Sequence, residues 1–219
     1  MNTKKLLISI TTIICLALLI TACYFVFYRS FDIVDTYIRL EPIRNSEQFN
    51  ATKDYINRNT NNGSYQIFYD TNNFPSESYE DYCHILVHYT VKNYSPFNIS
   101  VNDGYITDMT TADYVMFKRP IAFETNLGAF ELKVSEDCYD FLCYRGDLSD
   151  EELIEKFKDL QINVLYENLF FNSLTYKCDL SNSIFVSSFD EFDEIRNQIM
   201  SNKWMLFLFD KSTSNFITM

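Results

Sequence analysis

The stretch YCHILVHYTVKN, from Tyr82 to Asn93, decides the fold because its side chains alternate with a period of two residues. One face of the resulting strand carries Cys83, Ile85, Val87, Tyr89 and Val91, and the other carries His84, Leu86, His88 and Thr90. Such alternation is typical of a β-strand, in which successive side chains point to opposite sides of the sheet. We expect this strand to lie near the centre of its sheet.

Other short strands are predicted on both sides of this one. The segments FNISVNDGYITDM, DYVMFKRPIAF and GAFELKVS, within residues 97–135, show similar patterns, and an Asn-Asp-Gly turn interrupts the first. Upstream, FDIVDTYIRLEPI at residues 31–43 is predicted to be a first strand. Short strands separated by turn residues at this spacing are typical of a β-sandwich, so the predicted fold class is mainly β.

Two short helices are predicted among the strands, each beginning with a capping box. The first, LSDEELIEKFKDL, begins at Ser149 with Glu152, and the second, SSFDEFDEIRNQIM, begins at Ser188 with Glu191. The inward faces are predicted to carry Leu153, Ile154, Phe157 and Leu160 in the first helix, and Phe189, Phe192, Ile195 and Ile199 in the second. Strands QINVLYENLFF and KWMLFLFD should follow them, and the chain should end in a hairpin turned at residues 211–214.

A resemblance to a known kind of domain rests on two of these segments. HILVHYTVKNYSPFNISV contains a V-x-Y-x-V-x-N-x-S strand and turn, and LSDEELIEKFKDLQINVLY contains a short S-D-E-E helix that leads into a late strand. Together they resemble immunoglobulin-like domains of membrane-anchored extracytoplasmic proteins of low-GC Gram-positive bacteria, over roughly residues 80–167. The resemblance implies an immunoglobulin-like β-sandwich at the cell surface and carries no active-site residues across.

Four segments are predicted along the chain. Residues 1–29 would be a membrane anchor or lipoprotein signal, and residues 30–64 a first strand followed by a spacer rich in Asn, Thr and charge, either loops alone or loops with a short helix. Residues 65–168 would form the immunoglobulin-like sandwich. Residues 169–219 would form a C-terminal extension of strand, helix and hairpin packed on the sandwich.

The N-terminal run has no charged residue from Leu6 to Tyr28 and follows Lys4 and Lys5. At about 1.5 Å per residue, it predicts a transmembrane helix across a hydrocarbon core of about 30 Å, with the N-terminus in the cytoplasm. Alternatively, the tetrapeptide Ile-Thr-Ala-Cys ending at Cys23 resembles the lipobox of bacterial lipoproteins, whose cysteine is lipidated. Either anchor, single-pass or lipid, places the later residues outside the cell membrane.

The composition excludes some partners. The chain has 18 basic and 30 acidic residues and a formal net charge of −12, so its surface repels phosphate backbones and a nucleic-acid partner is not expected. Hydrophobic residues make up 47% of the chain and aromatic residues 17%, which favours a packed domain over a disordered stalk.

Four of the six cysteines lie beyond the N-terminal run, at Cys83, Cys138, Cys143 and Cys178. An even number in an oxidising compartment predicts two disulfides, with three possible connectivities. We favour Cys138–Cys143, across a tight turn, and Cys83–Cys178, between an early and a late strand. The alternative is that all four are buried free thiols.

Metal and catalytic motifs are weak in this sequence. His84 and His88 lie on one face of the predicted strand, about 13 Å apart, too far to share one metal ion. Acidic clusters such as SEDCYD lack the spacing of a calcium loop. The chain has four glycines and no G-x-S-x-G, H-E-x-x-H or phosphate-loop motif, so we predict no enzyme, no metal and no cofactor.

The predicted function is a non-enzymatic binding or interaction module, tethered at the outer face of the membrane, for an unknown protein or cell-envelope component. Exposed Tyr and Phe side chains would anchor the partner. One alternative is an envelope hydrolase that uses a pair of carboxylates in a cleft. Another is a structural subunit of a membrane complex.

Overall fold

A computed structural model describes residues 3–27, 30–59, 66–106, 113–119, 125–135, 138–169 and 174–201. Within these ranges the chain forms four α-helices, two short 3₁₀ helices and strands in two sheets, so the fold is mixed α and β. The 3₁₀ helices are η1 (Thr71–Asn73) and η2 (Tyr79–Asp81). The predicted strand KWMLFLFD and the final hairpin lie outside the described residues.

The larger sheet has the order β11-β1-β3-β8-β5-β2, with β7 also paired to β3. Its strands are β1 (Phe31–Pro42), β2 (Gln66–Ile67), β3 (Tyr82–Asn93), β5 (Val115–Arg119), β7 (Leu132–Val134), β8 (Tyr139–Tyr144) and β11 (Ile184–Phe185). The described pairs are antiparallel apart from β1 with β11. The central position predicted for β3 is confirmed, because it pairs with β1 on one side and with β8 and β7 on the other.

The smaller sheet has the order β10-β9-β4-β6, and its described pairs are all antiparallel. Its strands are β4 (Ile99–Ile106), β6 (Thr125–Leu127), β9 (Gln161–Asn168) and β10 (Leu174–Asp179). The register of β4 against β9 shifts between Val101 and Gly104. This sheet faces one side of the larger sheet and leaves the other side to helices.

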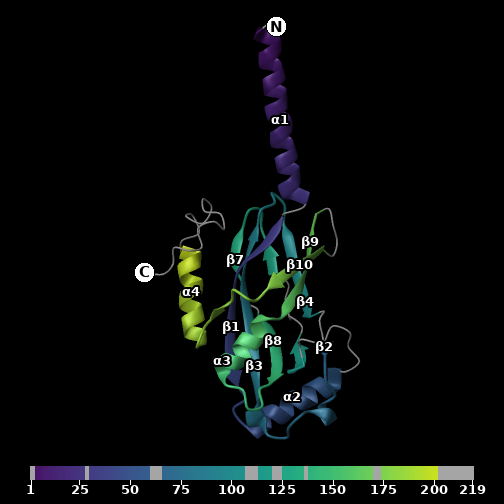
Figure 1. The fold of residues 1–219 in the computed structure, drawn as a ribbon, viewed down its shortest axis with the longest axis vertical. Helices are drawn as coiled ribbons and strands as arrows, with labels where there is room; N and C mark the ends of the chain where they lie inside the picture. Colours follow the sequence, from purple (N-terminus) through teal and green to yellow (C-terminus); the bar gives the residue numbers. More distant parts are fainter. Residues whose placement is uncertain are drawn as a thin grey trace.

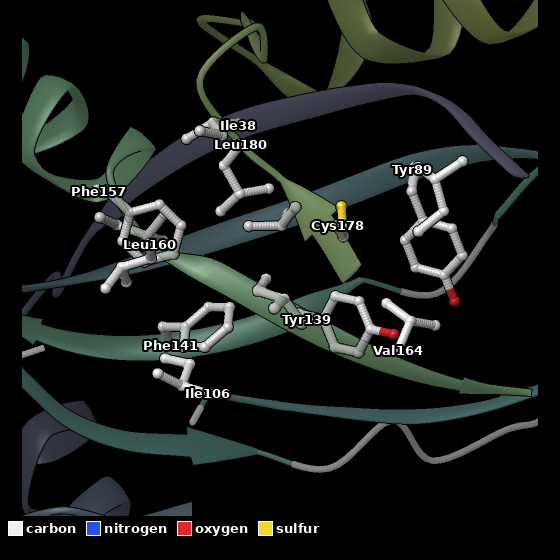
Figure 2. Packing of buried hydrophobic residues seen from close by; sticks show 14 of the residues in the cluster. Ile38, Tyr89, Ile106, Tyr139, Phe141, Phe157, Leu160, Val164, Cys178 and Leu180 are labelled. Atoms are coloured by element: carbon white, nitrogen blue, oxygen red, sulfur yellow. The ribbon is translucent and has the colours of Figure 1, made fainter. Parts of the chain in front are cut away.

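The main core lies between the two sheets. The five residues predicted for one face of β3 all belong to it, and they are Cys83, Ile85, Val87, Tyr89 and Val91. Figure 2 shows Tyr139 of the larger sheet beside Val164 of the smaller one, and Phe141 of the larger sheet beside Ile106 of the smaller one. Helix α3 (Asp150–Lys158) adds Phe157 to the same core.

Helix α3 begins as predicted. The Ser149 side chain accepts a hydrogen bond from the Glu152 backbone, and the Glu152 carboxylate accepts one from the Ser149 backbone at 2.9 Å. All four residues predicted for its inward face are buried: Leu153, Ile154, Phe157 and Leu160. The capping box and the apolar spacing therefore gave the correct start and the correct face.

Helix α2 (Ser46–Asn59) occupies the segment interpreted as a spacer. It packs on the outer face of the larger sheet through Phe49 and Ile56, which join a second apolar cluster with Met116 and Leu142. The two buried residues are seven positions apart, so they mark one narrow stripe two turns apart on an otherwise polar helix. Contact with the sheet, rather than a sustained apolar period, stabilises this helix.

Helix α4 (Phe189–Ser201) covers another part of the outer face. Phe192 is buried against Tyr37, Val134 and Val186, with Ile195 and Ile199 partly buried beside it. The inward orientation predicted for Phe189 is wrong, because that side chain is half exposed. Half of the predicted capping box is present, because the backbone N–H of Glu191 donates to the Ser188 hydroxyl. The Glu191 carboxylate, however, accepts from the backbone and hydroxyl of Ser187 and not from Ser188.

Helix α1 (Thr3–Phe27) extends away from the two sheets, at the opposite end of the molecule from α2 (Figure 1). The prediction of a transmembrane helix is not supported: within the described ranges, no helix has the length and apolarity needed to cross a membrane. Cys23 is an exposed free cysteine on this helix.

The two predicted disulfides, Cys138–Cys143 and Cys83–Cys178, are wrong. All six cysteines lie in described ranges and all are free thiols. Cys138 and Cys143 are five residues apart along nearly extended chain, or about 16 Å, which no disulfide can bridge. Cys83 lies in β3 of the larger sheet and Cys178 in β10 of the smaller one, and both thiols are free. The register instead places Cys83 opposite Cys143.

Candidate functional site: the α2 groove

An open groove of about 370 Å³ lies between α2 and the outer face of the larger sheet, and we call it the α2 groove. The sheet contributes Glu41, His84, Leu86, Phe117, Arg119 and Asp140. The helix contributes Gln48, Ala51, Thr52, Tyr55 and Arg58. Among these residues, only His84 was singled out by the sequence, and then only as an unlikely metal ligand.

Strand register brings the charged groups of the groove together. Arg119 of β5 and Leu86 of β3 both lie opposite Asp140 of β8. Two residues from Leu86 along β3, His84 lies opposite Glu41 of β1. Directly opposed and diagonal side chains on one face of a sheet are close enough to interact. The strands β1, β3, β5 and β8 therefore supply one cluster of charged side chains.

Helix α2 supplies the opposite wall from one side of its surface. Its lining residues recur at intervals of three or four positions, which places them on one helical face. Asn45 begins the helix, because its side chain accepts a hydrogen bond from the Gln48 backbone at 2.8 Å. Phe49 and Ile56, buried beside the groove, attach this wall to the sheet.

His84 and Asp140 form the central polar pair of the α2 groove. Nδ1 of His84 donates to a carboxylate oxygen of Asp140 at 2.7 Å, and their side chains are 16% and 19% exposed. Burial by itself lowers the pKa of His84. The hydrogen bond and charge of Asp140, with the charge of Glu41, outweigh that effect and raise the pKa above 6.5.

Arg119 lies beside this pair and against the helix. Its guanidinium nitrogen is 4.0 Å from the second carboxylate oxygen of Asp140, and its side chain is half exposed. The guanidinium also lies over the ring of Tyr55, 4.8 Å from the centroid. A cation over an aromatic ring is attracted to the electron-rich face, so Tyr55 holds Arg119 at the wall of the groove.

The remaining carboxylate of the groove, Glu41, is paired with Arg39 on the same strand. Arg58, on the helix wall, donates from Nε to the backbone carbonyl of Asp54 at 3.2 Å. With His84 protonated, three cations and two carboxylates line the groove, and Arg39 compensates one of those carboxylates. The groove is therefore locally cationic in a chain whose net charge is −12.

His88 faces the same side of β3 but does not reach the α2 groove. It is buried under α4, stacked on Phe192 with the ring centroids 4.0 Å apart. Neither ring nitrogen has a hydrogen-bond partner in the described part of the chain. Burial, together with the charge of Arg39, lowers the pKa of His88 to about 4.

The cysteines predicted as disulfide partners do not form a site together. Cys83 and Cys143 are buried between the sheets, where burial raises the pKa of the Cys83 thiol to about 12. Cys138 is partly exposed before β8, and Cys178 is buried in β10. Across the described ranges, no three His, Cys, Asp or Glu side chains gather closely enough to hold a metal ion.

Exposed aromatic side chains, which the sequence predicts as partner anchors, occur away from the groove. Phe185 on β11 and Phe189 at the start of α4 are 45% and 50% exposed, next to exposed Ile184. Phe130, in the turn before β7, is exposed as well. The guanidinium of Arg39 lies over the Phe189 ring, 5.5 Å from its centroid, and is paired with Glu41.

Sequence reasoning missed Asp140, Arg119 and Glu41 because their meeting depends on strand order. The available signal was their position at alternate sites of predicted strands, on the face opposite the core. No known protein family matches the sequence, and no curated protein is significantly similar to it.

Proposed function

We propose that this protein is a binding module that recognises a ligand or a segment of a partner in the α2 groove. The observation that carries the proposal is the convergence of His84, Asp140 and Arg119, from three different strands, on one open groove. Ligand sites are typically concave, with apolar surface and a few polar groups that orient the ligand. Ala51 and the ring of Tyr55 supply the apolar surface here, above the buried side chains of Leu86 and Phe117.

The position of the groove suits a tethered module. Helix α1 leaves the body at one end and α2 lies at the other (Figure 1). We propose that the body is extracytoplasmic and that a lipid on Cys23 anchors it to the cell membrane, as the lipobox resemblance implies. The groove would then face away from the membrane, toward a protein or envelope component.

We also propose that the two sheets are a divergent immunoglobulin-like sandwich. Support comes from the largely antiparallel strands and from a common core between the sheets. In that case α2 and α4 are additions to the outer face of one sheet, and the binding site lies on an addition rather than on a sandwich edge.

A hydrolase that uses a carboxylate pair is the second candidate. It rests on Glu41 and Asp140, which line the same groove. Each has a basic partner, Arg39 for Glu41 and His84 for Asp140. Hydrolases of this type need one carboxyl group in a setting that keeps it protonated as a general acid. Paired ions are better suited to holding a ligand, so we favour binding.

The two histidines allow a direct test with the full-length protein in detergent micelles. Labelling histidine with ¹³C at Cε1 gives one NMR signal from the groove, His84, and one from the core under α4, His88. A mixed set of neutral, anionic and cationic aromatic fragments is then added. We expect at least one fragment to shift His84 and leave His88 in place. If every fragment leaves His84 unmoved while His88 reports a folded protein, the groove is not a binding site.

A further inference from the structure

We propose that the α2 groove binds an organic anion, with a carboxylate or phosphate group held by Arg119, Arg58 and His84 and an apolar portion resting on Ala51 and the ring of Tyr55. This inference rests on the proposed binding function and names the class of its ligand. Charge and geometry of the lining residues carry it.

Arginine is the side chain best suited to this task. Its planar guanidinium donates two parallel hydrogen bonds to a carboxylate or phosphate, and it stays charged at every physiological pH. Arg119 comes from the sheet wall and Arg58 from the helix wall, so an anion in the groove would have a guanidinium on each side. Tyr55 fixes the position of Arg119 from its far side.

The carboxylates of the groove are already occupied by basic partners. Asp140 accepts from His84 at 2.7 Å, and Glu41 is paired with Arg39. These two pairs lower the repulsion that an incoming anion would meet. A cationic ligand, in contrast, would have to compete with the existing partners of both carboxylates.

His84 faces four charged groups, each from an identified element. Asp140 on β8 and Glu41 on β1 attract its proton, whereas Arg119 on β5 opposes it. Arg58 lies across the groove on α2. An anion bound beside His84 would add a third negative charge and strengthen protonation, so anion binding and proton binding at His84 should favour each other.

The apolar side chains of the groove indicate that the ligand also carries an apolar group. Leu86, opposite Asp140, and Phe117, beside Tyr55 with ring centroids 6.1 Å apart, are buried beneath the groove. Ala51 and the ring of Tyr55 line the groove above them, and a free inorganic anion would leave this apolar surface uncovered. An aromatic or alkyl group attached to the anion would cover it and add hydrophobic binding energy.

The experiment compares four small probes that share one ring and differ in charge. They are benzoate, phenyl phosphate, neutral benzamide and cationic benzylamine, added to the histidine-labelled full chain in micelles. We expect benzoate or phenyl phosphate to shift His84 at concentrations at least tenfold below those needed for benzamide, with no effect of benzylamine. The two anions separate a carboxylate ligand from a phosphate ligand.

Two arginine variants make the test specific to the groove. Arg119→Gln should weaken binding of the anions about tenfold, because a charge-assisted hydrogen bond is lost. Arg196→Gln on α4, where Arg196 pairs with Asp193, is the matched control and should leave affinity unchanged. If Arg119→Gln disturbs the His88 signal, Arg58→Gln replaces it as the test.

The possible failures are distinguishable. If benzamide or benzylamine shifts His84 as readily as the anions do, the groove binds ligands but is not selective for anions, and only this inference fails. If none of the four probes, nor any fragment of the mixed set, shifts His84, the proposed function fails with it. Anion binding that survives in both Arg119→Gln and Arg58→Gln would also overturn the inference.

Discussion

His84 and His88 lie on the same face of β3, four residues apart, in opposite electrostatic settings. His84 donates to Asp140 at the edge of an open groove, whereas His88 is enclosed by α4 and stacked on Phe192. The pKa of the first is raised and that of the second is lowered. Each of the two helices packed on the outer face thus lies over one histidine, and only α2 leaves its histidine accessible.

Removing the partner of His84 should lower its pKa. In Asp140→Asn the charge is lost and the amide oxygen accepts only a weaker, neutral hydrogen bond, so burial prevails and the pKa should fall below 6.5. An NMR titration of the His84 signal measures this. Glu155→Gln, which removes an exposed acid on α3, is the control. An unchanged His84 pKa in Asp140→Asn would show that Asp140 is not its main partner.

The same pair predicts a pH dependence of stability. Because the folded-state pKa of His84 is raised, its contribution is fully present below about pH 6.5 and is lost as the pH rises through the raised value. Asp140→Asn should therefore lower the free energy of unfolding more at pH 6 than at pH 9. Urea unfolding at the two pH values checks the sign.

His88 should make the fold sensitive to acid. Its pKa of about 4 lies below that of the unfolded chain, so the stability present above about pH 6.5 is lost as the pH falls toward 4. The loss should reach about 3 kcal/mol at pH 4. His88→Leu should remove this part of the acid sensitivity, whereas His84→Gln should retain it. Urea unfolding between pH 7 and pH 4 measures the difference.

Gly104 in β4 is predicted to tolerate no side chain. A Cβ there would lie 2.9 Å from the Tyr139 hydroxyl and 3.0 Å from a methyl carbon of Ile162. Because both neighbours are in packed surroundings, Gly104→Ala should destabilise the fold by about 1–3 kcal/mol. Gly128→Ala is the control, since its Cβ would meet only a Glu131 carboxylate oxygen at 3.3 Å. Equal midpoints of thermal unfolding for the two variants would contradict the packing described here.

The cysteines provide a test of the corrected disulfide prediction. Full-length protein that is neither cleaved nor lipidated, unfolded in denaturant without reductant, should accept six alkyl groups, counted by intact mass. In the native state, Cys83 and Cys143 should react slowly, because burial raises the pKa of both thiols and shields them. Protection of a pair of cysteines in the unfolded chain would instead reveal a disulfide.

The parts of the fold that depend on local pattern were predictable. Alternation in β3 gave the strand and its buried face, and Ser149 with Glu152 gave the start of α3. At α2 the sequence predicts only a spacer or loops with room for a short helix, because only Phe49 and Ile56 mark its buried side and both depend on a sheet formed by distant segments. Phe189 matched the apolar period of α4 but lies beyond the edge of the surface that the helix covers.

The candidate site depends on information that no local pattern contains. Asp140 meets His84 because β8 pairs with β3 in one particular register, and Arg119 joins them because β5 pairs with β8. The predicted Cys83–Cys178 disulfide failed for the same reason, because β3 pairs with β8 and the register partner of Cys83 is Cys143. Strand order, which a single sequence does not reveal, decides both.

The alternation of β3 also limits how this protein can change. A slip of one residue in its register would turn Cys83 and Ile85 outward into the groove and drive both histidines into the core. Insertions or deletions within β3 would therefore damage binding and folding together. The face of α2 that lines the groove has no such constraint, because its lining residues Thr52 and Arg58 are separate from the buried pair Phe49 and Ile56. New ligand preferences could arise on the helix wall while the sheet stays as it is.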